Sequence, residues 1–369
     1  MINLQEKKLR GGFTTGAAAA AGALASLYFL YGEKKDKIDF FALDKTPLSI
    51  PVKNVESTEF GAKAEVIKNS GDDPDITNGV SIFTEIRILK DTDKIIFKAG
   101  VGIGIVTKKG LALEVGEPAI NPGPRKLITN LIKPLLKKNT GAEIIISIPA
   151  GKELAKKTLN PALGIVGGLS VIGTTGVLRP MSEEGFKNAL LPQIDVAKAA
   201  GFNTQVFVPG KIGERIAIEN GIPKEAIVET SNFIGFMLDA AREKKLSQIL
   251  LFGHLGKLSK VAAGVFYTHN RIADARMETI AAYAAETGIS SINVNKILTA
   301  NTTEDALTIL DEENLTDIVC KKIAKRASER ATRYVFNELK IGTVLVTLKG
   351  RLLGLDKNAE EILREIKVK

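Results

Sequence analysis

Short apolar segments alternate with helical stretches through the middle of this 369-residue chain, and no other feature limits its fold as strongly. We expect strands over residues 144–148, 169–172, 204–208, 226–228 and 248–252. Helices would separate most of them, over 184–200, 211–220 and 233–244. Buried strands that alternate with helices are typical of a parallel sheet covered on both faces. This part of the chain therefore predicts an α/β doubly wound, Rossmann-like domain.

The preceding part of the chain predicts a sheet of another kind. Turn residues separate short β-branched segments, over 38–42, 48–52, 61–68, 80–89 and 95–99. Apolar and polar residues alternate over 80–89, which indicates a strand with one solvated face. Helices are expected on either side of these strands, over 17–31 and 124–138. We therefore expect an α+β N-terminal domain over 1–140 and the Rossmann-like domain over 141–300.

The C-terminal segment, residues 301–369, combines helices with a strand. After a helix over 271–287, we expect helices over 317–339 and 358–366, with a strand over 342–349 between them. The pattern leaves open whether this strand completes the second sheet or returns to the first domain.

The charge balance limits the class of partner. Lys and Arg number 51 against 42 Asp and Glu, which gives a formal net charge of +9 and favours anionic partners. The chain has no Trp and no basic block interleaved with aromatic residues, the pattern that stacks on single-stranded nucleic acid. We therefore expect an anionic small molecule as partner, and no nucleic acid.

The apolar stretch 17–31 resembles a signal peptide, because it follows a basic segment. No clear cleavage site follows it, and it is shorter than the roughly 20 residues that span a bilayer. Cys320 is the only cysteine, which excludes an internal disulfide and a multi-cysteine metal site. We expect 17–31 to be a buried helix of a cytoplasmic protein without membrane contact, and Cys320 to be a buried structural thiol.

Six segments rich in Gly, Thr, Asn or Pro carry the candidate functional residues. Such composition is typical of loops that lie close to a ligand, where backbone must approach and side chains stay short. The segments are LRGGFTTGAAAAA (9–21), GDDPDIT (71–77), AGVGIGIVTKKGL (99–111), INPGPR (120–125), GLSVIGTTG (168–176) and GHLGKLSKVAAGVFYTHNRIADAR (253–276).

Four small-residue segments come directly after expected strands. They are GTTG (173–176), PG (209–210), TSNFIG (230–235) and GHLGK (253–257). Ligands bind beyond the carboxyl ends of the strands in an open parallel sheet. We therefore expect these four segments to meet at one ligand-binding edge.

In this order and spacing, the segments resemble the cobalt-precorrin-5B C1-methyltransferase family, the CbiD type, of anaerobic cobalamin biosynthesis. The likeness covers 10–276 and rests on GFTTG, GDDPDIT, AINP, the stretch 158–176, SNFIG, GHLGKL and TH..IADAR. One departure is visible, because the family often has Thr-Cys after GFTTG and this chain has Ala17 and Ala18. That departure argues against a required cysteine nucleophile.

The resemblance implies methyl transfer from S-adenosyl-L-methionine to ring carbon C1 of cobalt-precorrin-5B, a contracted tetrapyrrole, giving cobalt-precorrin-6A. Cobalt would enter only as part of the substrate, and no separate metal site is expected. The family is similar to Rossmann-like sheets in its second domain. The oligomeric state stays open, a homodimer included.

Glycine-rich backbone is the expected cofactor site. After a strand, Gly173, Thr174, Thr175 and Gly176 offer backbone N–H groups to the carboxylate or ribose of the cofactor. A bare tight turn is the alternative. Gly102 lies in AGVGIG, which fails as a dinucleotide fingerprint because no helix pattern follows it. Two interpretations of Gly102 remain: a close approach of the backbone to a ligand, or a β-bulge.

Carboxylates cluster around Pro74, but their spacing is not that of a calcium-binding EF-hand loop. Asp73 is a candidate for holding the ribose hydroxyls or the amine of the cofactor, and Asp72 for taking up a proton. A capped surface turn is the alternative for both.

Cations beside the segments are candidates for binding the carboxylates of the substrate, because Arg and Lys pair well with carboxylate. They are Arg125, Lys257 and Arg276, with Lys260 and Arg271 behind them. Thr14 and Thr15, at the start of the first helix, complete the expected substrate-binding set. An ordinary solvated cation is the alternative for each charged residue.

The two histidines, His254 and His269, both lie in the last segment. A histidine can manage a ring proton near neutral pH, or bind the substrate's cobalt as an axial ligand. We treat both as catalytic candidates, with a hydrogen-bonded structural role as the alternative.

Two other classes of function compete with a methyltransferase. A nicotinamide-dependent reductase predicts G-x-G-x-x-G between strand and helix with an acidic residue some 20 residues on, which the chain lacks. A tetrapyrrole carrier would bind a corrinoid but show no affinity for S-adenosylmethionine.

Overall fold

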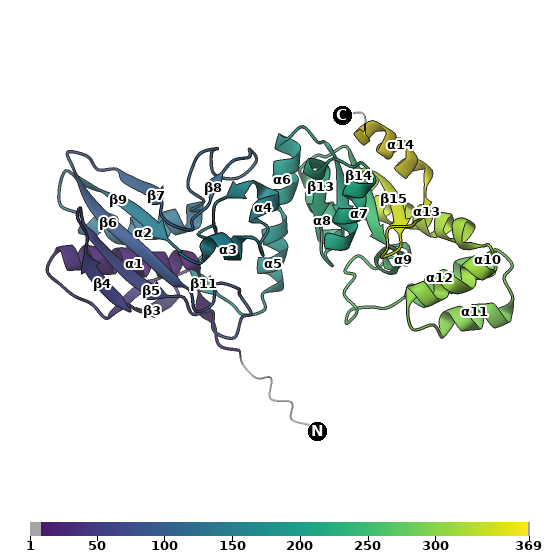
Figure 1. Cartoon of the computed structure of the whole chain (residues 1–369), viewed down its shortest axis with the longest axis horizontal. Helices are drawn as coiled ribbons and strands as arrows, with labels where there is room; N and C mark the ends of the chain where they lie inside the picture. The colour runs from purple at the N-terminus through teal and green to yellow at the C-terminus, as the bar shows by residue number, and fades with distance from the viewer. Residues whose placement is uncertain (1–8, 368–369) are drawn as a thin grey trace, which may run out of the picture. The chain divides into compact units, whose positions relative to one another are not determined.

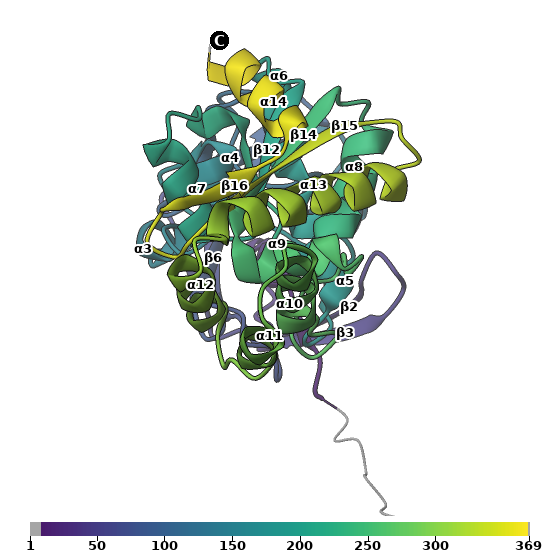
Figure 2. The same ribbon diagram turned by 90° about the vertical axis from the view of Figure 1, so that its right-hand side faces the viewer.

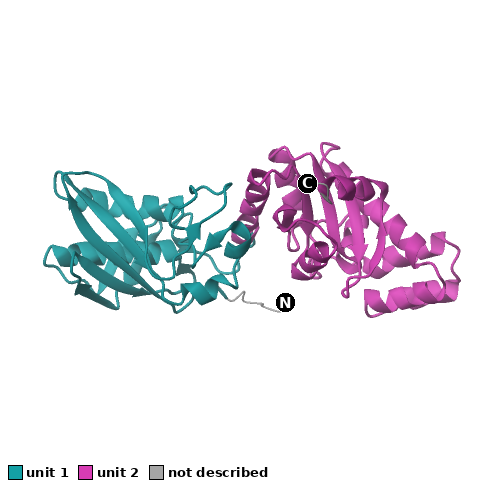
Figure 3. Ribbon diagram, turned by 45° about the horizontal axis from the view of Figure 1, so that its top comes forward, with its two compact units in different colours: residues 1–183 teal, residues 184–369 magenta. Residues whose placement is uncertain are grey.

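The computed structural model describes residues 9–367, and the chain divides into two compact units, 1–183 and 184–369 (Figures 1 and 3). Each unit contains its own five-stranded sheet. The mixed α/β fold expected from the sequence is therefore confirmed.

The first unit is built on a sheet in the order β4-β5-β6-β9-β7. The strands are β4 (Asn54–Ser57), β5 (Ala62–Ile67), β6 (Ser81–Lys90), β7 (Ile95–Ala99) and β9 (Thr140–Ser147). β7 pairs parallel to β9, and the other neighbours pair antiparallel. Helix α1 (Thr15–Leu30) packs against β5 and β6, and α2 (Pro122–Ile132) packs against α1.

Helix α1 forms the centre of this core, because its side chains are small enough for close packing. Ala17 to Ala21 are fully buried, and a Cβ on Gly22 would lie 2.9 Å from Thr84 Oγ1 of β6. Ser26 Oγ donates a hydrogen bond to the Thr84 carbonyl oxygen at 2.9 Å. The apolar stretch near the N-terminus is thus a buried core helix, as expected. Across residues 9–367 there is no helix long and apolar enough to cross a membrane.

Shorter elements complete the first unit. Two-stranded sheets join β1 (Gly12–Phe13) to β11 (Val177–Leu178), β2 (Lys37–Phe41) to β3 (Pro47–Pro51), and β8 (Ile105–Val106) to β10 (Ile165–Val166). The short helices are η1 (Lys133–Leu135), α3 (Gly151–Ala155) and α4 (Asn160–Leu163).

The second unit is built on a sheet in the order β13-β12-β14-β15-β16. The strands are β12 (Thr204–Val208), β13 (Ile227–Glu229), β14 (Gln248–His254), β15 (Lys340–Val346) and β16 (Leu352–Leu355). The first four are parallel, and β16 pairs antiparallel to β15.

Helices pack on both faces of this second sheet. One face shares a core with α7 (Lys211–Glu219) and α14 (Lys357–Lys367). On the other face, Ser328 of α13 (Thr316–Tyr334) bonds Thr343 of β15 at 2.8 Å. The remaining helices are α5 (Glu183–Leu190), α6 (Pro192–Ala199), η2 (Lys224–Ala226), α8 (Ile234–Glu243), α9 (Leu255–Ala262), α10 (Arg276–Glu286), α11 (Ser291–Leu298) and α12 (Thr303–Glu312). Figure 2 shows α10, α11 and α12 grouped together below α13.

Two expected strands of the second sheet belong elsewhere. The strand expected over 144–148 exists as β9, but it pairs with β6 and β7 of the first unit. Residues 169–172 form only isolated bridges, Leu169 with Ile103 and Val171 with Ile120. The two compact units consequently divide after Glu183, whereas the sequence placed the boundary after 140. A short apolar run does not reveal its pairing partner, so both segments were assigned to the wrong sheet.

The C-terminal segment belongs to the second sheet, which the sequence had left open. β15 pairs with β14 over its whole length, from Lys340 opposite Gln248 to Val346 opposite His254. The final strand and helix then complete the same unit.

Candidate active site

The carboxyl edge of the parallel sheet gathers three of the four small-residue segments. β12, β13 and β14 run in the same direction, so the segments at 209–210, 230–235 and 253–257 follow their carboxyl ends. GTTG does not follow a strand of this sheet, because residues 169–172 before it form only isolated bridges within the first unit. The expected four-segment edge is therefore corrected to three.

Lys257, on the first turn of α9, is held between two neighbouring segments. Its Nζ donates hydrogen bonds to Asn232 Oδ1 and to the Thr268 carbonyl oxygen, the latter at 3.3 Å. Burial lowers the pKa of the Lys257 ammonium, and the charges of Lys260 and Arg276 lower it further. Lys257 is therefore a half-buried cation with two polar contacts.

Lys260 lies one turn further along α9 and is fully buried. Its Nζ donates to the carbonyl oxygens of Thr268 (3.3 Å) and Ala273 (2.9 Å) and to Asn270 Oδ1 (2.7 Å). Burial lowers the pKa of Lys260, an effect that the charge of Asp274 opposes and that of Arg276 reinforces. These three bonds fix the conformation of the loop 268–273.

Arg276 is paired rather than free. Its Nε and Nη2 donate to the two carboxylate oxygens of Asp274, at 2.7 and 2.6 Å. The bidentate hydrogen bonds from Arg276 lower the pKa of Asp274. The pair lies beside Lys257 and Lys260, so the structure does bring Lys257 and Arg276 together.

His254 ends β14 and caps α9. Its Nδ1 accepts a hydrogen bond from the Gly256 backbone N–H at 3.0 Å, and its Nε2 lies 3.1 Å from Glu304 Oε1. Nδ1 as acceptor assigns the proton to Nε2, which donates to Glu304. Both ring nitrogens are engaged, which is the arrangement of a structural histidine.

His269 keeps one ring nitrogen available. Nδ1 accepts from the Arg271 backbone N–H at 3.2 Å, whereas Nε2 has no partner within residues 9–367. Its ring centroid lies 6.3 Å from that of Tyr267. Of the two histidines, His269 is the better placed to exchange a proton with a ligand.

In the first unit, the GTTG loop wraps around the start of α1. Thr14 N–H donates to the Gly176 carbonyl oxygen at 2.9 Å, and Thr15 Oγ1 exchanges hydrogen bonds with the Ile172 backbone at 3.2 and 2.9 Å. Thr14 and Thr15 are 8% and 3% exposed. Their side chains therefore hold the loop in place. Their hydroxyl groups are not accessible to a substrate, although the sequence predicted such a contact.

The starts of α1 and α2 lie against each other and against this loop. A Cβ on Gly16 would lie 2.6 Å from Pro124 Cγ, and one on Gly123 would lie 2.4 Å from the Gly173 carbonyl oxygen. Neither helix has an acidic residue in its first turn. Within residues 9–367 no acceptor meets the backbone N–H groups of Gly123 or of residues 173–175. Unpartnered N–H groups in this loop and at the N-terminus of α2 suit an anionic group.

Two aspartates of GDDPDIT form hydrogen bonds to distant residues of the first unit. Asp72 accepts hydrogen bonds from the Arg10 backbone N–H and from its guanidinium, at 2.8 to 3.2 Å. Asp73 Oδ2 accepts from the Met181 backbone N–H at 2.8 Å. These contacts match the capped-turn alternative for both residues.

Arg125 and Gly102 also have structural partners. The Arg125 guanidinium donates to the carbonyl oxygens of Ile120 and Pro118 and to Glu117 Oε1, at 2.7 to 3.3 Å. A Cβ on Gly102 would lie 1.9 Å from the Ile148 carbonyl oxygen, so this glycine permits close packing of backbone on backbone. We therefore expect neither residue to contact a ligand.

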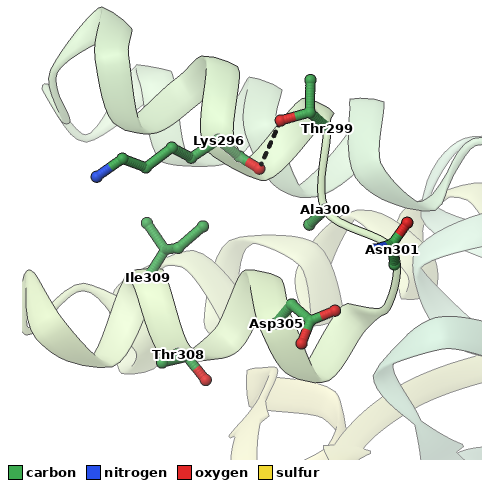
Figure 4. A pocket seen from close by; sticks show the side chains of 7 residues that line it. All are labelled: Lys296, Thr299, Ala300, Asn301, Asp305, Thr308 and Ile309. Atoms are coloured by element: carbon green, nitrogen blue, oxygen red, sulfur yellow. Dashed lines mark hydrogen bonds between the residues drawn. The ribbon is translucent and has the colours of Figure 1, made fainter.

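A separate hollow of about 410 Å³ lies between α11 and α12 (Figure 4). It is lined by Lys296, Thr299, Ala300, Asn301, Asp305, Thr308 and Ile309. No residue predicted from the sequence lines this hollow, and we leave it outside the candidate site.

Comparison with known proteins places the chain. Residues 2–180 match the sequence model of CbiD, and 267–357 match that of the CbiD C-terminal domain. A cobalt-precorrin-5B C(1)-methyltransferase of Methanocaldococcus jannaschii is 47% identical, over 96% of this chain and 98% of that protein. The chain belongs to the CbiD family. Its resemblance to this family, seen in the sequence motifs, is thereby confirmed.

Two further relatives differ in how similar they are to this chain. A cobalt-precorrin-5B C(1)-methyltransferase of Moorella thermoacetica is 47% identical, over 97% of this chain and 98% of its own length. A CbiD cobalamin biosynthesis protein from Archaeoglobus fulgidus, known from a crystal structure, is 26% identical. The match covers 76% of this chain and 85% of that chain, with a TM-score of 0.38.

Three residues of this CbiD-family chain were not singled out from the sequence. Asn232, Thr268 and Asn270 contact the Lys257 and Lys260 ammonium groups. All three stand inside motifs that were recognised, SNFIG and TH..IADAR. Neutral side chains in a motif carry little signal of their own, and only the fold shows that they surround two cations.

Proposed function

We propose that this chain is a cobalt-precorrin-5B C1-methyltransferase, which methylates ring carbon C1 of cobalt-precorrin-5B and gives cobalt-precorrin-6A in anaerobic cobalamin biosynthesis. The observation that carries the proposal is 47% identity to a protein of that name over 96% of this chain and 98% of the relative. Because the matched region covers 96% of the chain, it extends over both units.

We propose S-adenosyl-L-methionine as the methyl donor, since its sulfonium carries a methyl that an electron-rich ring carbon can attack. The residues present fit one part of this molecule. The unpartnered N–H groups of Gly173, Thr174 and Thr175, at the starts of α1 and α2, are suited to its carboxylate. Support for this placement is the geometry of the loop and the absence of acidic side chains in both first turns.

We propose that the tetrapyrrole binds at the carboxyl edge of the second unit's sheet. Its many carboxylates suit the cations there, Lys257 and Arg276, which the fold brings together. His269, with Nε2 available, is our candidate for managing the proton on the methylated ring. The residues then orient the substrate and handle a proton, while the electron-rich macrocycle provides the nucleophilic carbon.

Two finer proposals follow from the fold. We propose that the second unit is a doubly wound, Rossmann-like domain, supported by parallel strands with α7 and α14 on one face and α13 on the other. We also propose a cytoplasmic location, because the stretch that resembles a signal peptide is α1, the core helix of the first unit.

Turnover by the purified protein tests the function. Incubation with S-adenosyl-L-methionine and cobalt-precorrin-5B should yield a tetrapyrrole heavier by one methylene group, detected by mass spectrometry. Thermal unfolding with S-adenosylhomocysteine, NADPH and a corrinoid separates the three classes of function. S-adenosylhomocysteine should raise the free energy of unfolding by about 2.7 kcal/mol at a hundredfold excess over its Kd. Stabilisation by NADPH alone would favour a reductase, and by the corrinoid alone a carrier.

A further inference from the structure

A row of four rings lies along the segments that follow β13 and β14. The ring centroid of Phe233 lies 5.8 Å from that of Phe186 and 4.9 Å from that of Tyr267. His269 continues the row, with its centroid 6.3 Å from that of Tyr267. Phe233 is buried, whereas Phe186 is 52% exposed and the other two rings are half-buried. Three of the four rings therefore keep surface that a ligand can contact.

The backbone turns these rings to one side. Phe233 and Tyr267 are directly opposite each other in an antiparallel bridge, so their side chains share a face. His269 lies two positions after Tyr267 and returns to the same face, because successive side chains of an extended chain alternate. Thr268, between the two, is fully buried. The loop therefore directs one set of side chains to the core and the ring set outward.

The rings are suited to a conjugated ligand. Neighbouring rings are tilted by 34° to 54° to one another, so the row presents ring edges as well as ring faces. An aromatic edge is positive and an aromatic face negative, and tilted contacts of both kinds with a second π-system are favourable. A flat conjugated molecule can therefore gain contact with several of these rings at once.

Cations border the row. Lys187 Nζ lies 5.2 Å from the centroid of the Phe233 ring. At the other end of the row, Arg271 is exposed, and its backbone N–H donates to His269. Lys257 Nζ donates to a backbone carbonyl oxygen of the same loop, at 3.3 Å. Rings with positive charge along their border suit a ligand that combines a conjugated face with an anionic rim.

We propose that Tyr267, with Phe186 and His269 along the same row, forms a platform for one face of the tetrapyrrole macrocycle. This inference rests on the proposed function, because it takes the polycarboxylate tetrapyrrole as the ligand of this edge. It adds to the charged contacts a group of residues that recognises the macrocycle itself. Adenine, the conjugated part of the cofactor, is neutral at pH 7 and gains little from a cationic border.

The sharpest test removes the flat ring and keeps an apolar side chain. Tyr267→Leu should weaken corrinoid binding by roughly three- to tenfold, since it loses the contacts that depend on a π-system. Tyr267→Phe keeps the ring and should bind within about twofold of the wild type. Phe186→Leu, at the exposed end of the row, should weaken binding in the same direction and by a smaller factor.

Phe266→Leu is the matched control for loosening of the loop. Phe266 is the residue before Tyr267, and its ring faces the other way, with its centroid 4.2 Å from that of Tyr334 on α13. This variant also loses an aromatic contact of the same loop, but on the side of the core. It should lower the thermal unfolding temperature and bind the corrinoid like the wild type.

Titration calorimetry of these proteins uses three probes: cobyrinic acid, a corrinoid with free carboxylates; cobinamide, in which amides replace them; and S-adenosylhomocysteine. Tyr267→Leu should weaken binding of both corrinoids by the same factor, because both contain the macrocycle. That factor should be the same at low and high salt, since salt screens charges and not ring contacts. Lys257→Met, in contrast, should weaken binding of cobyrinic acid alone. Affinity for S-adenosylhomocysteine should stay normal in every variant.

The outcomes separate the platform from the proposed function. If Tyr267→Leu binds both corrinoids like the wild type, the platform is wrong and the proposed function stands. Equal losses of affinity in Tyr267→Leu and Phe266→Leu would overturn the platform too, because the rings would then only hold the loop. Loss of S-adenosylhomocysteine affinity in Tyr267→Leu would assign the row to adenine instead. A wild type that binds none of the three probes rejects the proposed function itself.

Discussion

His254 Nε2 lies 3.1 Å from Glu304 Oε1, which ties the end of β14 to helix α12. The other ring nitrogen of His254 caps α9 at Gly256. His254→Ala should therefore lower the free energy of unfolding by about 1 kcal/mol, the usual cost of a lost N-cap. His254→Asn should recover most of that loss, because Asn is also a good cap. Urea unfolding measures both, and a well-folded His254→Asn protein without turnover would show that His254 is catalytic after all.

His269 should behave in the opposite way. Within residues 9–367 its Nε2 has no hydrogen-bond partner, and its Nδ1 accepts a hydrogen bond from Arg271 N–H. His269→Gln should reduce kcat by about a hundredfold or more if the side chain transfers a proton, with little change in stability. The pH dependence of kcat should lose one limb in the variant. A normal kcat and pH profile would remove His269 from the mechanism.

The GTTG loop can be tested through a matched pair of glycines. Gly173 has φ +139°, and a Cβ there would lie 2.2 Å from Thr14 Oγ1, whereas Gly167 has φ +93° with nothing within 4 Å. Both Gly→Ala variants carry backbone strain of about 1–3 kcal/mol, but only Gly173→Ala must also displace the loop from α1. We expect tenfold or greater loss of S-adenosylhomocysteine affinity for Gly173→Ala, and near-normal affinity for Gly167→Ala. Equal affinities in the two variants would contradict a cofactor site at this loop.

A buried ion pair under the GDDPDIT turn should control acid stability. Lys68 Nζ lies 2.7 Å from Asp75 Oδ2, with the Lys68 side chain 1% exposed. Burial raises the pKa of Asp75, but hydrogen bonds from Lys68 and Thr77 outweigh it and leave that pKa lowered. The pair therefore stabilises the protein above the unfolded pKa of about 4, and this contribution is lost as pH falls through the folded pKa.

Lys68→Met should accordingly cost roughly 3 kcal/mol at pH 7, and the difference from wild type should narrow on acidification. Lys53→Met is the control, because Lys53 pairs with Glu65 while its side chain stays 58% exposed. An exposed pair of this kind is worth less than about 1 kcal/mol. Urea unfolding at several pH values checks both variants, and a pH-independent gap for Lys68→Met would refute the coupling.

Elements that depend only on the local residue pattern were predicted correctly from the sequence. The strand expected over 95–99 is β7, and the buried helix expected over 17–31 is α1. Both could be predicted because each is a run of mostly apolar residues. The partner of β9 could not be predicted, since its short apolar run suits an antiparallel sheet as well as a parallel one. The same limit applies to the site. Lys257 and Arg276 were found by charge, but the neutral Asn232 and Thr268 only gain meaning from the two ammonium groups beside them.

Cys320 offers a last test, of a thiol that takes no part in the reaction. Burial raises its pKa to about 12, and the backbone of Gly354 packs against it, with an added Cβ there only 3.1 Å from Cys320 Cβ. A thiol that stays protonated and enclosed is a poor nucleophile. Iodoacetamide at pH 8 should leave Cys320 unmodified in the native protein and alkylate it in urea, as read by intact mass. Cys320→Ala should keep its turnover at a stability cost of about 1 kcal/mol. After GFTTG this chain has fully buried Ala17 and Ala18 and no cysteine, so turnover lost in Cys320→Ala would indicate thiol chemistry.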